Sequence, residues 1–149
     1  MRILLIDDDE TTVRRLIALL TGLSRGSGAF QVWRADGLFE GLRRLDDSAE
    51  AFDLVVLDLG LAECGGPIAL KLVRAQAPGI PVVVVTTGDG PEVERAVRDA
   101  GASGYLARGR LDASALERAL GHASARGRSS PPMPARPELS GSFRLIGGG

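Results

Sequence analysis

The chain of 149 residues is poor in several features, and each shortage excludes something. A single cysteine, Cys64, rules out an internal disulfide bond, and with no His or Cys cluster near it a metal site at this thiol is not expected. The chain has no uninterrupted apolar run of about 18 residues and no basic-then-apolar leader, so it predicts neither a membrane span nor export. We therefore expect a cytoplasmic protein without a membrane partner.

The chain also has no marked excess of positive or negative charge, because its formal net charge is only -1. Electrostatics therefore give no reason to expect direct binding to nucleic acid. Lysine is almost absent: Lys71 is the only one, and every other basic residue apart from one histidine is arginine. An arginine at a position where another protein would carry lysine is less surprising in such a chain. The 44% hydrophobic and 25% charged positions fit one soluble globular domain plus a remainder.

Short apolar runs alternate with segments of helical periodicity. The runs predict five buried strands at residues 2–6, 30–35, 54–57, 80–86 and 103–107. The helical segments begin near residue 10, near residue 38, near Pro67, at residue 91 and at residue 112, and the last two end near residues 100 and 123. This alternation predicts an α/β fold, with a five-stranded parallel sheet, helices on both faces and right-handed crossovers.

The apolar positions of the helical segments predict which side of each helix faces the sheet. The expected inward residues are Val13, Leu16, Ile17 and Leu20, then Leu38, Phe39, Leu42 and Leu45, then Ile68, Leu72 and Val73, and finally Leu116 and Leu120. Residues 22–28 are expected to form a loop. From residue 124 the periodicity stops in a mixture of Pro, Ser and Arg, so we predict a domain at 1–122 and a disordered tail at 123–149.

Polar residues stand where the predicted strands end: Asp7 and Asp8, Asp58, Thr86 and Arg108. Ligands of open α/β sheets bind at this edge. Asp9 or Glu10 suits helix capping, but an unbroken run of four acids needs a cation to share the charge. Three converging carboxylates suit Mg²⁺, and a magnesium ion there would attract an anionic oxygen such as that of a phosphate. Asp58 could then act as a nucleophile that forms an acyl phosphate, with Thr86 and Arg108 holding phosphoryl oxygens.

Four segments, LLIDDDE, DLVVLDLGLAECGG, IPVVVVTTGD and GASGYLARG, occur in order with one at each of four predicted strands. Together they resemble the receiver domain of two-component response regulators, which is CheY-like and flavodoxin-like in fold. The resemblance covers residues 1 to about 122. It implies a phosphorelay signalling module rather than an enzyme. Its implied partners are a sensor histidine kinase or phosphotransfer protein and a downstream protein or second copy bound through residues 91–100, 103–107 and 112–123.

The resemblance also implies a role for each site residue. Asp58 resembles the phosphoacceptor. Asp7 and Asp8 resemble the acidic pair that binds Mg²⁺ with Asp58, with Asp8 favoured over Asp7 as the direct ligand, and the backbone carbonyl of Gly60 resembles a further ligand. Thr86 and Tyr105 resemble the switch pair. Three positions depart from the family pattern: Arg108 replaces a lysine, Gly109 a proline and Ala62 a common loop proline. Arginine keeps the charge, but its planar guanidinium is larger than an ammonium.

Three hypotheses follow from these residues. The first is a switch in which phosphorylation of Asp58 changes partner preference. The second is a degenerate receiver that binds proteins without phosphorylation. The third is an enzyme or cofactor binder on the same fold. The acidic run after the first strand disfavours a flavodoxin-like FMN site because it would repel phosphate, and Gly60 stands where a haloacid dehalogenase-type phosphatase has its second acid.

Overall fold

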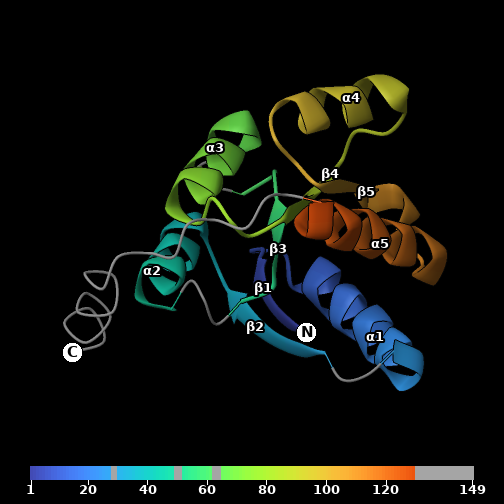
Figure 1. Cartoon of the computed structure of the whole chain (residues 1–149). Helices are drawn as coiled ribbons and strands as arrows, with labels where there is room; N and C mark the ends of the chain where they lie inside the picture. Colours follow the sequence, from blue (N-terminus) through green and yellow to red (C-terminus); the bar gives the residue numbers. More distant parts are fainter. Residues whose placement is uncertain (28–29, 49–51, 62–64, 130–149) are drawn as a thin grey trace.

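The computed structural model describes residues 1–27, 30–48, 52–61 and 65–129, and in them strands and α-helices alternate along the chain (Figure 1). The strands are β1 (Arg2–Ile6), β2 (Gln31–Ala35), β3 (Leu54–Asp58), β4 (Val82–Thr86) and β5 (Gly104–Ala107). The helices are α1 (Glu10–Ser27), α2 (Leu38–Ser48), α3 (Gly66–Gln76), α4 (Pro91–Asp99) and α5 (Ala113–Ser129), with a short 3-10 turn, η2 (Arg108–Arg110). The predicted five strands and five helices are confirmed.

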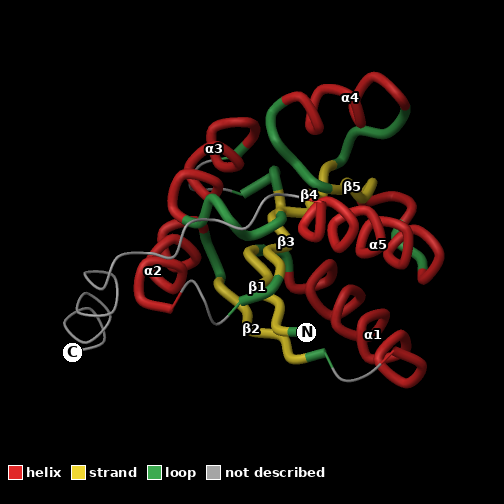
Figure 2. The backbone as a smooth tube through the Cα atoms, in the orientation of Figure 1, coloured by secondary structure: helices red, strands yellow, loops and turns green. Residues whose placement is uncertain are grey.

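All five strands belong to one parallel sheet of order β2-β1-β3-β4-β5. Figure 2 shows the sheet between two layers of helices, with α1 and α5 on one side and α2 and α3 on the other. Val97 of α4 packs into the same core cluster as α2 and α3. The predicted α/β fold with helices on both faces is therefore confirmed.

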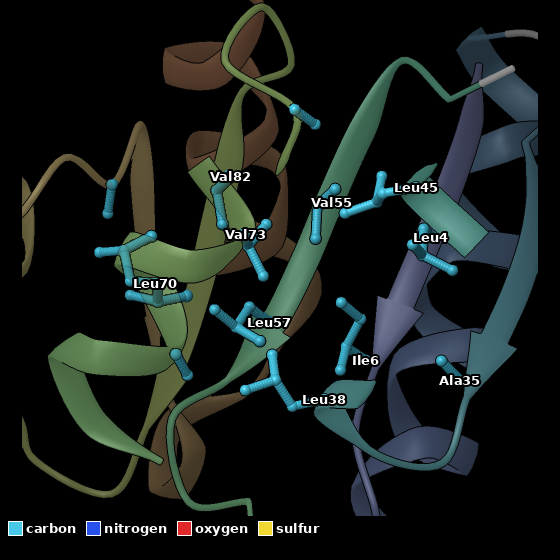
Figure 3. Packing of buried hydrophobic residues seen from close by; sticks show 14 of the residues in the cluster. Leu4, Ile6, Ala35, Leu38, Leu45, Val55, Leu57, Leu70, Val73 and Val82 are labelled. Atoms are coloured by element: carbon cyan, nitrogen blue, oxygen red, sulfur yellow. The ribbon is translucent and has the colours of Figure 1, made fainter. Parts of the chain in front are cut away.

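Alternate residues of each central strand enter opposite cores, as the two-residue period of a strand requires. Leu4, Ile6, Val55 and Leu57 pack beneath α2 and α3 (Figure 3), whereas their neighbours along β1 and β3 pack beneath α1 and α5. Both faces of the sheet are covered, so these strands read as continuous apolar runs in the sequence.

Four of the predicted inward residues are wrong. Phe39 and Ile68 each leave 61% of their surface exposed, and Leu72 (40%) and Ile17 (38%) are also exposed. In α3 the buried residues are instead Ala69, Leu70 and Val73. Ala69 lies at the helix–sheet contact and Ile68 beside it, because the rotation of the helix about its axis is set by packing of the whole face and not by the hydrophobicity of single residues. The other predicted inward positions are buried or packed against the core.

Two helices are longer than the pattern predicts. α1 continues to Ser27 instead of ending at Gly22, because Leu23 still packs against the core. α5 continues to Ser129, past the predicted end near Ala123, so the predicted disorder is wrong for residues 124–129, where Ala and Arg favour helix. The rest of the predicted tail, residues 130–149, lies outside the described residues. None of the helices in the described ranges is long and apolar enough to cross a membrane.

Candidate functional site

The polar residues singled out above meet at the carboxyl edge of the sheet. Asp7 directly follows β1, Asp58 ends β3, Thr86 ends β4 and Arg108 directly follows β5. Strand pairing aligns these ends, since it places Asp58 beside Val85 and leaves Ile6 beside the residue before Asp58. The sheet therefore gathers side chains that are far apart in the sequence.

Three carboxylates form the centre of this edge. Oxygens of Asp7, Asp8 and Asp58 lie within 4.8 Å of one another. Asp7 is fully buried and Asp58 is 1% exposed, whereas Asp8 is exposed. Two buried acids beside a third create a strongly negative environment, which a divalent cation with oxygen ligands would neutralise.

The two oxygens of each buried carboxylate differ in their hydrogen bonding. Oδ1 of Asp7 accepts from the Asp9 N–H at 2.9 Å, and Oδ1 of Asp58 accepts from the Gly60 N–H at 2.9 Å. Oδ2 of each residue is buried and has no hydrogen-bond partner among the described residues. Because buried oxygens without donors are costly, this pair fits a site for Mg²⁺.

The charge state of Asp7 responds to this environment. Burial raises the pKa of Asp7 to about 7, and the nearby Asp58 carboxylate adds to the rise, whereas the Asp9 N–H opposes it. A proton and a metal ion would both relieve the same repulsion. Burial and the Asp58 carboxylate therefore favour the protonated form of Asp7 more than for an ordinary aspartate.

Arg108 supplies positive charge to the cluster. Its Nη2 lies 2.7 Å from Oδ1 of Asp58, and its Nη1 lies 3.7 Å from Oδ2 of Asp9. The side chain of Arg108 is 29% exposed. The guanidinium thus reaches the position that the sequence predicts for it, and it spans two acids rather than one.

Arg34 is a site residue that the sequence analysis missed. From β2 it donates to the backbone carbonyl of Asp7 through Nε and Nη2, both at 3.4 Å, and to Glu10 through Nη1 at 2.7 Å. It also pairs with Asp36 at 3.2 Å. These contacts fix the loop that carries Asp7 and Asp8, and only the position of Arg34 near the end of a strand hinted at such a role.

The two residues predicted as a switch have separate partners. Oγ1 of Thr86 accepts from the Gly88 N–H at 3.4 Å. The Tyr105 hydroxyl donates to Oδ1 of Asp89 at 2.6 Å and accepts from the Gly90 N–H at 3.2 Å. Arg110 holds the other oxygen of Asp89 at 3.0 Å, so a network that the sequence analysis did not foresee orients Tyr105.

The remaining predicted positions lie around the acids. A side chain at Gly60 would begin 3.4 Å from Oδ1 of Asp58, so glycine leaves the space beside the carboxylate open. Gly109 lies in η2 with no atom near the place of its missing side chain. Ala62 falls outside the described residues.

A cavity of about 130 Å³ lies on the side formed by α4, β5 and α5, and its lining does not include Asp7, Asp8 or Asp58. Its lining includes Tyr105, Asp89, Arg98, Arg110 and His122. Nη2 of Arg98 lies 3.1 Å from Nδ1 of His122, so the histidine is tied to α4. The cavity therefore belongs to the face on which Tyr105, the predicted switch residue, lies.

Comparison with known proteins agrees with this geometry. Residues 3–120 match the family model of the response regulator receiver domain, so the chain belongs to this family of signalling modules. The chain is 34% identical over 133 residues to the transcriptional regulatory protein ZraR of Salmonella typhimurium, covering 87% of this chain but 28% of that protein. It therefore spans a minor part of this relative.

Solved structures show the same fold. A response regulator receiver domain from Clostridium thermocellum is 26% identical, with a TM-score of 0.69 over 85% of this chain and 96% of that one. CheY in a CheX–CheY complex with BeF3 and Mg²⁺ from Borrelia burgdorferi has a TM-score of 0.69 at 18% identity, over 80% of this chain and 86% of that one. The CheY-like fold of the chain is thus shown.

Proposed function

We propose that this chain is a phosphoacceptor receiver, which takes a phosphoryl group onto Asp58 from a histidine kinase or a phosphotransfer protein and signals through protein contacts. The observation that carries the proposal is a pair of buried oxygens without donors, Oδ2 of Asp7 and Oδ2 of Asp58. Beside them, the Arg108 guanidinium forms an ion pair with the other oxygen of Asp58. Family membership supports it, since receiver domains of response regulators act with kinases and other protein partners.

The residues at the edge divide the chemistry of phosphoryl transfer among them. A carboxylate oxygen of Asp58 attacks phosphorus, the bond between phosphorus and the donor breaks, and the donor leaves with the electron pair. Asp7, Asp8, Asp58 and the carbonyl of Gly60 would hold Mg²⁺, which when bound neutralises charge on the phosphoryl oxygens. Arg108 and the Thr86 hydroxyl would receive the remaining phosphoryl oxygens.

The output would pass through the face formed by α4, β5 and α5. Thr86 lies at the end of β4 and pairs in register with the last residue of β5, the strand that carries Tyr105. A shift of Thr86 toward a phosphoryl group would change the loop that holds Asp89, and with it the Tyr105 hydroxyl. A downstream protein or a second copy that prefers the altered face would then shift the population of states.

One observation favours a second candidate, a degenerate receiver that binds proteins without phosphorylation. The Arg108 guanidinium already pairs with Asp58 at 2.7 Å. Because Arg108 already neutralises the Asp58 carboxylate, a bound Mg²⁺ would stabilise the site less, and a phosphoryl group would have to displace the arginine. In this case the face of α4, β5 and α5 would have one fixed form.

Intact mass spectrometry after incubation with Mg²⁺ and acetyl phosphate separates the two candidates. We expect a phosphoryl adduct on the parent protein and none on Asp58→Asn, which keeps the shape of the side chain. The adduct should also be lost when Mg²⁺ is removed with EDTA. A folded parent protein that gains no adduct would reject the phosphoacceptor function, and Arg108→Lys would then show whether the arginine is the cause.

A further inference from the structure

The two oxygens of the Asp58 carboxylate have different surroundings. Oδ1 accepts a hydrogen bond from the Gly60 N–H at 2.9 Å and forms an ion pair with Nη2 of Arg108 at 2.7 Å. Oδ2 has no donor and belongs with Oδ2 of Asp7 to the side suited to a cation. If the cation takes Oδ2, the oxygen that remains for a bond to phosphorus is the one that Arg108 covers.

The position of Arg108 depends on a second carboxylate. Nη1 of Arg108 lies 3.7 Å from Oδ2 of Asp9. Asp9 is itself held, because its Oδ2 accepts from the hydroxyl of the buried Thr12 at 2.6 Å. A guanidinium is planar and rigid, so an acid at Nη1 restrains the nitrogen that contacts Asp58. A lysine ammonium, with a single nitrogen, could not be held in this way at two separated acids.

We propose that Asp9 is a positioning residue that holds Arg108 over Oδ1 of Asp58 and so limits the rate of phosphoryl uptake. The inference rests on the proposed function, because it concerns the oxygen that attacks. Oδ1 forms its bond to phosphorus only after Arg108 has moved off it; the donor then leaves with its electron pair, and the guanidinium turns to the new phosphoryl oxygens. Asp9 retards this movement by stabilising the covered state.

The rate of phosphorylation of Asp9→Asn tests the proposal. Asparagine caps a helix as well as aspartate and can still accept from Thr12, but it has no charge to hold Arg108. We expect uptake from acetyl phosphate, followed by intact mass, to be about two to five times faster, which corresponds to one part-exposed ion pair. The affinity for Mg²⁺, measured by calorimetry, should stay the same because Asp9 is not a ligand.

Asp112→Asn is the matched control. Asp112 follows Arg108 by four residues, also caps a helix, accepts from the Ala115 N–H at 2.7 Å and has no ion pair with Arg108 among the described residues. If Asp112→Asn accelerates uptake as much as Asp9→Asn, the effect is general repulsion of the anionic donor, and the proposal is rejected. An unchanged or slower rate in Asp9→Asn, or a weakened affinity for Mg²⁺, would reject it as well.

A double-mutant cycle tests the ion pair between Asp9 and Arg108, here called the tether, independently of phosphorylation. Urea unfolding of the parent, Asp9→Asn, Arg108→Gln and the double variant measures the coupling between the two residues. A favourable coupling supports the tether, and additive effects overturn it. If no protein in the series gains an adduct while the coupling persists, the proposed phosphoacceptor function fails and the tether stands.

Discussion

Replacing Asp7 by asparagine should remove most of the pH dependence of stability that the metal-free protein shows between about pH 5 and pH 8. Asp7 is fully buried, and its Oδ2 has no hydrogen-bond partner among the described residues. Burial, aided by the Asp58 carboxylate, raises the pKa of Asp7 from 3.8 to about 7. The folded state therefore holds a proton that the unfolded chain releases at lower pH.

The sign and size of the effect follow from this difference. Because the folded state binds more protons than the unfolded state between the two pKa values, stability falls as pH rises through this range. A rise of about 3 units corresponds to about 4 kcal/mol in total, of which about 3 kcal/mol is lost between pH 5 and pH 8. An amide does not titrate, so Asp7→Asn lacks this loss.

The assay is urea unfolding in EDTA at several pH values. The parent should lose about 3 kcal/mol relative to Asp7→Asn over the range, and saturating Mg²⁺ should reduce that loss because the ionised form binds the metal. Asp8→Asn is the control, since Asp8 is exposed and its removal should leave the pH dependence in place. Parallel profiles for the parent and Asp7→Asn would refute the reasoning.

Three further changes have defined outcomes. Arg34→Ala removes the hydrogen bonds to the Asp7 carbonyl and to Glu10, so we expect a several-fold weaker affinity for Mg²⁺ by calorimetry. An unchanged affinity would show that these bonds do not position the acidic loop. Burial is the main cause of the raised pKa of Tyr105, and the hydrogen bond to the Asp89 carboxylate raises it further. Asp89→Asn removes the carboxylate and leaves the burial, so the pKa should fall but stay above its ordinary value. Tyr105 is the only tyrosine, so its ultraviolet titration is unambiguous. Gly41→Ala should destabilise the fold by about 1–3 kcal/mol in urea, because its Cβ would overlap a core side chain of β1, whereas Gly22→Ala, which meets open space, should be neutral or stabilising by up to about 1 kcal/mol; equal effects would contradict the packing argument.

The order and type of the elements could be predicted from the sequence because both are local properties. A strand such as β3 is buried on both faces and so appears as a continuous apolar run, and its last residue, Asp58, stands at the sheet edge by position alone. The convergence of Asp7, Asp8 and Asp58 follows from the parallel arrangement, and the structure brings them within 4.8 Å. Their roles in phosphorylation and metal binding remain predictions.

Helix rotation could not be predicted in the same way. Phe39 and Ile68 are as hydrophobic as their buried neighbours, yet each is 61% exposed. The side of α3 that meets the sheet is the one with Ala69 and Leu70, which packing of the whole helix selects. Hydrophobicity along one segment contains no information about the surface that it will meet.

The sequence by itself determined the fold, the edge of the sheet that collects the polar residues and the identity of the acids there, because these depend on local periodicity and on where strands end. Tertiary structure alone decided which arginines reach the acids and the loop that carries them. Arg34 from β2 reaches the loop after β1, and Arg108 after β5 joins Asp58 to Asp9. Such contacts join segments that only the assembled sheet brings together, so the charge balance of the site is a property of the folded chain.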